Sequence, residues 1–222
     1  MNSREKAVDI VSVNLTTDTG YNIFRDLNFT LFAGETAIIS GSAGSGKTYL
    51  SELIIGGQRP NSGSVNIFGQ NIYSAGEGQK AAIRRRIGGV GGIFDLLPFD
   101  TVEINLQYPL ILRGASRKAR KMKSEQIMAQ LNISALRSRK VTSLTRGERL
   151  KVLLARAIIA DQPLLLIDEP LDRMGPAAAT DINTVLKRLS VSGYTMLILT
   201  TEQEKPSIPQ AREFRLYEGR LL

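Results

Sequence analysis

The run GSAGSGKT at residues 41–48 restricts the possible folds of this chain more than any other feature. It fits the pattern G-x-x-x-x-G-K-[ST], and it stands between an apolar run, Thr36–Ser40, and a helical pattern. The glycines let the backbone turn its amides inward around phosphate oxygens, and the helix that follows adds its positive N-terminal end. The run therefore predicts a phosphate-binding loop (P-loop) between a strand and a helix.

The side chains at the end of this loop have predicted roles in binding a nucleotide. Lys47 is expected to reach the β- and γ-phosphates, and Thr48 is expected to bind Mg²⁺. The predicted nucleotide-binding residues of this segment are Gly41, Ser42, Ala43, Gly44, Ser45, Gly46, Lys47, Thr48 and Tyr49.

A second motif, LLLIDEP, is an apolar run that ends in an acidic pair. We expect its strand to lie beside the strand that precedes the P-loop, so that Asp168 would hold Mg²⁺. Glu169 would then face the terminal phosphate and polarise an attacking water as a general base. The alternative is an acidic pair that opens a turn before Pro170, but the P-loop favours the catalytic interpretation. Glu169 and Lys47 are the predicted catalytic residues.

Hydrophobic periodicity predicts an α/β fold. Apolar runs at residues 36–40, 164–168 and 195–200 are typical of parallel strands buried on both faces. Alternating residues in AVDIVSVNL, LNFTLF and GSVNIFG predict antiparallel strands. We therefore expect one domain over residues 1–222: a P-loop core with a mostly parallel sheet, an antiparallel β part at about 1–35 and 60–75, and an inserted helical part at about 95–150.

Three local signals set element boundaries. Thr145 and Glu148 form a capping box, which predicts a helix from about residue 147 to residue 160. Pro176 suits the first turn of another helix. The segment EFRLYEGRLL predicts a closing hairpin with its turn near Glu218 and Gly219.

Composition excludes several kinds of chemistry. The chain contains no cysteine and no histidine, which removes thiol metal sites and the commonest acid/base near neutral pH. It has no apolar run of spanning length and no apolar segment like that of a signal peptide, so we expect a cytoplasmic protein.

The net charge is +8, and RGASRKARKMK at residues 113–123 is a dense basic run. A solvated helix face is the favoured interpretation of that run, contact with anionic lipid comes next, and nucleic acid is not expected because the run has no aromatic residue.

The order of these motifs resembles the ATP-binding subunit of ABC transporters over nearly the whole chain. A P-loop, a helical insertion, LTRGE opening a helix that continues ARA, and a strand ending in DEP follow one another. The stretch RRRIGGVGGIFDLLPFDTVEINLQYPLILRG is similar to the branch that serves lipoprotein release, macrolide export and cell division.

The resemblance implies ATP and Mg²⁺ as ligands and a peripheral position on the cytoplasmic face of a membrane. It implies two partners: a second ATP-binding subunit, in a homo- or heterodimer, and an integral membrane protein. Each nucleotide would lie between the P-loop of one subunit and the signature helix of the other, where Thr145, Arg146 and Gly147 would contact it.

Four positions depart from the family pattern. The signature Leu-Ser-Gly-Gly-Gln is LTRGE here, with Arg146 in place of a glycine. Gly92 aligns with the usual glutamine, Gly175 with the usual second aspartate, and Thr201 with the usual histidine. Tyr21 is a candidate for stacking on adenine, and a plain turn tyrosine is an equal alternative.

These departures leave three functions open. The first is a slow ATPase in which Arg146 acts as an arginine finger on the neighbour's γ-phosphate. The second is a regulatory subunit that binds ATP without hydrolysing it, in which Arg146 is only a surface residue. The third, a P-loop kinase, leaves the LTRGE and DEP motifs unexplained.

Overall fold

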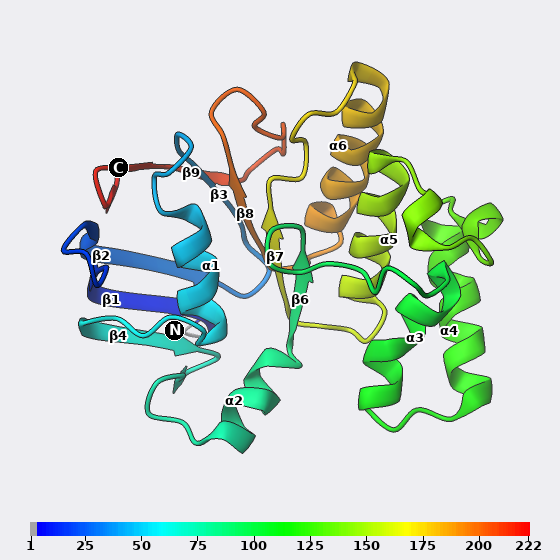
Figure 1. Ribbon diagram of the computed structural model, residues 1–222, viewed down its shortest axis with the longest axis horizontal. Coiled ribbons are helices and arrows are strands. Elements are labelled where there is room, and N and C mark those ends of the chain that lie inside the picture. The colour runs from blue at the N-terminus through cyan, green and yellow to red at the C-terminus, as the bar shows by residue number, and fades with distance from the viewer. Residues whose placement is uncertain (1–3) are drawn as a thin grey trace.

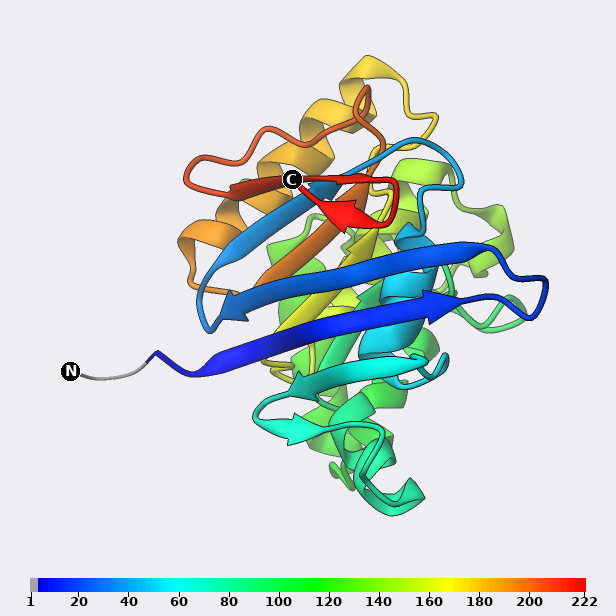
Figure 2. The ribbon, with the colours of Figure 1, turned by 90° about the vertical axis from the view of Figure 1, so that its left-hand side faces the viewer.

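The computed structural model describes residues 4–222, and its first layer is an antiparallel sheet. Four strands follow the order β2-β1-β4-β5, and Figure 2 shows the three longer ones side by side in front of α1. Inward residues of β1 alternate with exposed ones, as expected for a sheet with one solvated face. The strands are β1 (Lys6–Thr16), β2 (Asn22–Phe32), β4 (Ser62–Ile67) and β5 (Gln70–Asn71).

The second sheet contains the P-loop strand and has the order β10-β9-β3-β8-β7-β6. Four of its five strand pairings are parallel, and the fifth, between β9 and β10 in the closing hairpin, is antiparallel. Every residue of β7 and β8 is buried, which confirms the prediction drawn from the two apolar runs. The strands are β3 (Thr36–Ser40), β6 (Ile87–Val90), β7 (Leu164–Asp168), β8 (Met196–Thr200), β9 (Arg212–Tyr217) and β10 (Arg220–Leu221).

One prediction about this sheet is wrong. The strand that ends at Asp168 does not lie beside the P-loop strand, because β8 pairs with both β3 and β7 and separates them. After β7 the chain runs through α6 (Pro176–Val191) and returns as β8 into the central position. Parallel strands still end at the same edge of the sheet, so Asp168 and the P-loop remain on one side.

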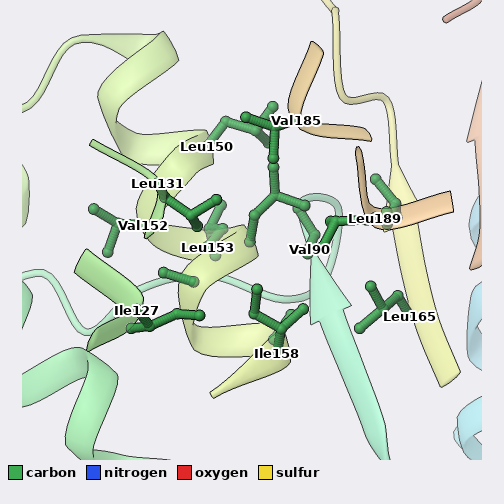
Figure 3. Close-up of a cluster of buried hydrophobic side chains, with 14 of the residues drawn as sticks. Val90, Ile127, Leu131, Leu150, Val152, Leu153, Ile158, Leu165, Val185 and Leu189 are labelled. Carbon is green, nitrogen blue, oxygen red and sulfur yellow. The ribbon is translucent and has the colours of Figure 1, made fainter. Parts of the chain in front are cut away.

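Helices cover both faces of the parallel sheet (Figure 1). Alternate residues of β7 enter different apolar clusters: Leu165 packs with α5 and α6, whereas Leu164 packs toward α1 and the antiparallel sheet. Figure 3 shows the first cluster, in which Leu153 and Ile158 of α5 meet Val90 and Leu165. The helices are α1 (Lys47–Ile55), α2 (Glu77–Arg84), α3 (Val102–Leu112), α4 (Arg117–Gln130), α5 (Arg146–Ile158) and α6, with 3₁₀ turns at Ser134–Leu136 and Val141–Ser143.

The local signals are confirmed within a few residues. Thr145 caps α5 with the expected capping box, Pro176 opens α6, and the closing hairpin turns at Glu218 and Gly219. Strand β2 starts at Asn22, earlier than its alternating pattern indicates. Helix α4 starts at Arg117 and therefore contains most of the basic run. In residues 4–222, no helix combines the length and apolar character that crossing a bilayer requires.

Strand β6 and helix α2 were not expected from the sequence. The strand has glycines at its centre because its neighbours approach too closely for side chains. A Cβ on Gly88 would lie 2.2 Å from the carbonyl oxygen of Ala157 in α5, and one on Gly89 would lie 2.1 Å from the ring of Phe94. Close backbone packing has thus replaced the apolar pattern by which a strand is normally recognised.

Candidate functional site

The P-loop joins β3 to α1 and takes the backbone conformation that its glycines permit. Gly44 and Gly46 have φ of 79° and 108°, and Gly46 is the N-cap residue that precedes α1. A side chain is strained at either angle. The loop therefore presents its amides at the N-terminal end of a helix, which is a suitable site for phosphate.

Lys47 is buried under this loop, with only 6% of its surface exposed. Its Nζ donates to the carbonyl oxygens of Gly41 at 2.8 Å and Ser42 at 2.9 Å. The same Nζ lies 3.7 Å from Oε1 of Glu169. The Lys47 side chain therefore has two neutral carbonyl partners and one carboxylate close by.

Glu169 follows β7 directly and is held in an unusual backbone conformation. Its φ is 48°, in the left-handed region, and its amide donates to the carbonyl oxygen of Leu199 at 2.8 Å. Such strain persists only where the surrounding structure fixes it, and it is commonest at functional sites. The bend turns the Glu169 carboxylate from the end of β7 toward Lys47.

Asp168 presents a buried carboxylate that needs a partner. The residue is 6% exposed, and its Oδ1 has no hydrogen-bond partner among the described residues. Burial, together with the negative charge of Glu169, raises the pKa of this carboxyl to about 6, although the positive charge of Lys47 acts in the opposite direction. Together with the hydroxyl of Thr48 on the same cavity, this unpaired acid fits Mg²⁺, which usually takes one or two carboxylates plus substrate phosphate oxygens. Residues 4–222 contain no group of three or more His, Cys, Asp or Glu side chains that could hold a metal ion.

The loop at Gly91 and Gly92 covers Asp168 with bare backbone. Both glycines have positive φ, 74° and 54°. A Cβ on Gly92 would lie 2.3 Å from Oδ2 of Asp168, and one on Gly91 would lie 2.3 Å from its carbonyl oxygen. In this conformation no side chain fits at either position. The close approach to Asp168 therefore explains why position 92, which aligns with the usual glutamine, is a glycine in this chain.

The start of α5 is tied to the segment that follows Glu169. Thr145 Oγ1 accepts from the Glu148 amide at 3.3 Å, and Glu148 Oε2 accepts from the Thr145 amide at 2.8 Å. Arg146, half exposed, forms an ion pair with Asp172, and Arg149 forms one with Asp95. The first turn of α5 is thus fixed by its cap and by two charge pairs within the same chain.

One cavity of about 650 Å³ brings several of the predicted residues together. Thr48, Asp168, Glu169, Arg146 and Gly92 all line it. Thr145, Gly147, Thr201 and Gly175 do not line it, although Gly147 lies in the same turn as Arg146. Two other lining residues, Asp172 and Asp95, were not predicted, because Arg146 and Arg149, with which they pair, are distant in the chain and no motif connects them.

Tyr21 lies in a second cavity of about 480 Å³ beside the P-loop. Ser42, Ala43, Gly44 and Ser45 form one side of this cavity, and residues 216–219 form another. The ring of Tyr21 is mostly exposed, which leaves one face free for a planar group. The hairpin at residues 216–219 was predicted, but its position next to the P-loop was not. Tyr49 lines neither cavity and packs against the core cluster near α1.

Comparisons with known proteins agree with this geometry. The family model described as "ABC transporter" matches residues 24–172. The chain is 34% identical to the lipoprotein-releasing system ATP-binding protein LolD of Chromohalobacter salexigens, over 88% of this chain and 83% of that protein. It is 27% identical to LolD of Geobacter metallireducens, over 100% of this chain and 99% of that protein.

A solved structure is also similar. The ATP-binding cassette MJ0796, in a dimeric post-hydrolysis state bound to ADP and Pi, superimposes with a TM-score of 0.83 at 26% identity. The match covers 96% of each chain. The expected fold class and the resemblance to the lipoprotein-release branch are both confirmed.

The buried acid generates a prediction about stability. The folded pKa of Asp168 lies above the ordinary value of 3.8, so the folded state binds more protons than the unfolded state between about pH 4 and pH 6. Stability is therefore lost as the pH rises through this window, by about 3 kcal/mol at most. Asp168→Asn removes that penalty. In EDTA, we expect the variant to gain more stability over wild type at pH 8 than at pH 5.

Urea unfolding at both pH values measures this difference. Asp18→Asn, at an exposed turn carboxylate, is the control and should show no such dependence on pH. An equal gain for Asp168→Asn at both pH values would contradict the burial of an ionisable acid at the site.

Proposed function

The chain belongs to the ABC transporter family as an ATP-binding subunit, and we propose that it binds MgATP and hydrolyses it slowly to drive an integral membrane partner. The observation that carries this proposal is the 3.7 Å approach of Lys47 Nζ to Glu169 Oε1. It puts a phosphate-binding lysine and a carboxylate base in contact, next to the unpaired acid of Asp168. All the charged groups that MgATP hydrolysis requires from one subunit therefore meet at the end of β7.

Each residue has a distinct role in this proposal. Lys47 exchanges its bonds to the Gly41 and Ser42 carbonyls for the β- and γ-phosphate oxygens. Asp168 and Thr48 would hold Mg²⁺, and the metal would supply positive charge against the phosphate groups. Glu169 orients the attacking water and accepts its proton. Binding of phosphate to Lys47 would leave the Glu169 carboxylate free for that task.

A second ATP-binding subunit would complete the site. In a symmetric pair of such subunits, the first turn of α5 would contact the nucleotide held by the other P-loop. Thr145 would offer its hydroxyl, Gly147 its amide and Arg146 its guanidinium. To reach that phosphate, Arg146 must leave Asp172, to which it is paired in this chain. Breaking the Arg146–Asp172 pair costs little free energy, because both side chains are partly exposed and such pairs contribute little to stability.

Arg146 partly replaces the contacts that Gly92 and Thr201 lack. A guanidinium beside a γ-phosphate stabilises the charge that develops in the transition state. A glycine at this position would supply only a backbone contact. The departure from the family signature is thus a functional substitution.

A groove at the base of the helical lobe suits the membrane partner. It has a volume of about 360 Å³, and its lining combines apolar groups such as Tyr108 and Leu112 with Arg84, Arg85 and Arg113. A segment of a membrane protein could fill it with an apolar side chain and an acidic one. In this proposal the subunit lies on the cytoplasmic face of the membrane, bound to that partner.

One prediction about ATP hydrolysis concerns Glu169. We expect Mg²⁺-dependent phosphate release from ATP to rise faster than linearly with protein concentration, because two subunits build each site. In Glu169→Gln we expect release to fall by roughly 10²- to 10⁴-fold, as for loss of a general base. Glu77→Gln, at an exposed site in α2, is the control and should match wild type. A chain that binds ATP tightly with no release, alone or with its membrane partner, would instead be a non-hydrolysing switch.

The second prediction concerns Arg146. We expect Arg146→Gly to slow phosphate release by roughly 10- to 1,000-fold with little change in ATP affinity, because the arginine acts in the transition state. Asp172→Asn, which frees Arg146 without removing it, should match or exceed wild type. A faster Arg146→Gly enzyme would show that the arginine obstructs the site.

A further inference from the structure

We infer that the surface where α3 ends and α4 begins binds an anionic lipid bilayer directly. This basic face consists of Arg113, Arg117, Lys118 and Lys121, with Leu112 and Met122 among them. The inference goes beyond nucleotide chemistry and does not depend on it.

The cations of the basic face lack counter-ions in the chain itself. Within the described residues, none of the four forms an ion pair, although acids lie nearby. Asp161 is paired with Lys123, and Glu125 is paired with Arg137. Arg113 donates only to the carbonyl oxygen of Arg85, at 3.3 Å. The face therefore carries an excess of positive charge that is available to an external anion.

Exposed apolar side chains accompany these charges. Leu112 is 69% exposed and Met122 is 61% exposed, values that are high for residues of their size. On α4, Lys118 and Met122 are four residues apart, so they lie on the same side of the helix, and Arg117 and Lys121 form the adjacent row. A mixed surface of this kind, with basic heads and short apolar groups, is suited to the boundary between lipid headgroups and acyl chains.

The position of the basic face agrees with this role. Arg113 and Leu112 also line the groove proposed for the membrane partner, so the face continues that surface toward α4. Figure 1 shows the connection between α3 and α4 at the lower edge of the molecule, whereas β6 and β7 point toward the upper edge. Lipid contact there would leave the nucleotide site at the carboxyl ends of the strands open.

Other anionic partners fit less well. Residues 113–123 include no aromatic side chain on which a nucleic-acid base could stack. An acidic protein segment would bind best in a groove. The groove lined by Leu112 and Arg113 lies beside this face, and Lys118, Lys121 and Met122 do not line it. A bilayer needs only an exposed basic surface, and each Lys or Arg near an anionic leaflet adds to the attraction.

Vesicle cosedimentation tests the inference with the full chain and without nucleotide or membrane partner. Vesicles of phosphatidylcholine are compared with vesicles that also contain phosphatidylglycerol. We expect binding only to the anionic vesicles, with a loss of affinity as NaCl rises from about 0.05 to about 0.5 M. The triple variant Arg117→Gln, Lys118→Gln, Lys121→Gln should lower the partition coefficient by about tenfold or more.

A matched variant separates local from overall charge. Lys187→Gln, Arg188→Gln, Arg220→Gln removes the same three charges from exposed sites elsewhere and should change the partition coefficient less than about twofold. Both triple variants should bind ATP as wild type does, which shows that they fold. Equal losses in the two variants, binding that ignores salt, or no binding to anionic vesicles at low salt would each overturn the inference.

Discussion

The structure depends on one arrangement of charge, in which the buried Lys47 and Asp168 meet the partly exposed Glu169 near the ends of β3 and β7. Burying the lysine and the aspartate is costly unless each finds a partner. Lys47 has two backbone carbonyls and one carboxylate, whereas Asp168 Oδ1 has none, and its pKa is raised accordingly. The central sheet, the bend at Glu169 and the glycines of the P-loop all serve to hold this cluster. The described residues leave Asp168 Oδ1 without a partner, and in the proposed function MgATP would supply what is missing: phosphate for the lysine and a metal for the acid.

The altered motifs surround this cluster and modify it. Gly91 and Gly92 lay backbone against Asp168 where the family usually has a glutamine, and Arg146 brings a guanidinium where it usually has a glycine. Relative to the family pattern, a side chain is therefore lost next to Asp168 and a side chain is gained at the start of α5. Within its own subunit, the Arg146 side chain forms an ion pair with Asp172. Hydrolysis is slow in this account because no replacement restores the missing histidine.

Local patterns predicted most of the fold, and long-range packing accounts for what they missed. The P-loop, the capping box at Thr145 and the buried runs that became β7 and β8 are signals within a few residues, so they could be recognised. Strand β6 could not be recognised, because Gly88 is a glycine on account of its close contact with the backbone of α5, and a glycine contributes nothing to an apolar pattern. The position of β8 between β3 and β7 is a choice of topology that no segment encodes alone. At the site, the pairing of Asp172 could not be predicted either, because its partner Arg146 lies on α5, far away in the sequence.

Calorimetric titration of ATP, with Mg²⁺ and with EDTA, tests the central claim most directly. The claim is that Asp168 is unpaired because it holds the metal that accompanies the nucleotide. Wild type should bind ATP more tightly with Mg²⁺ than with EDTA, and Asp168→Asn should bind it with nearly equal affinity under both conditions. If Asp168→Asn keeps the full effect of Mg²⁺, the buried acid does not hold the metal, and the account of the site is wrong.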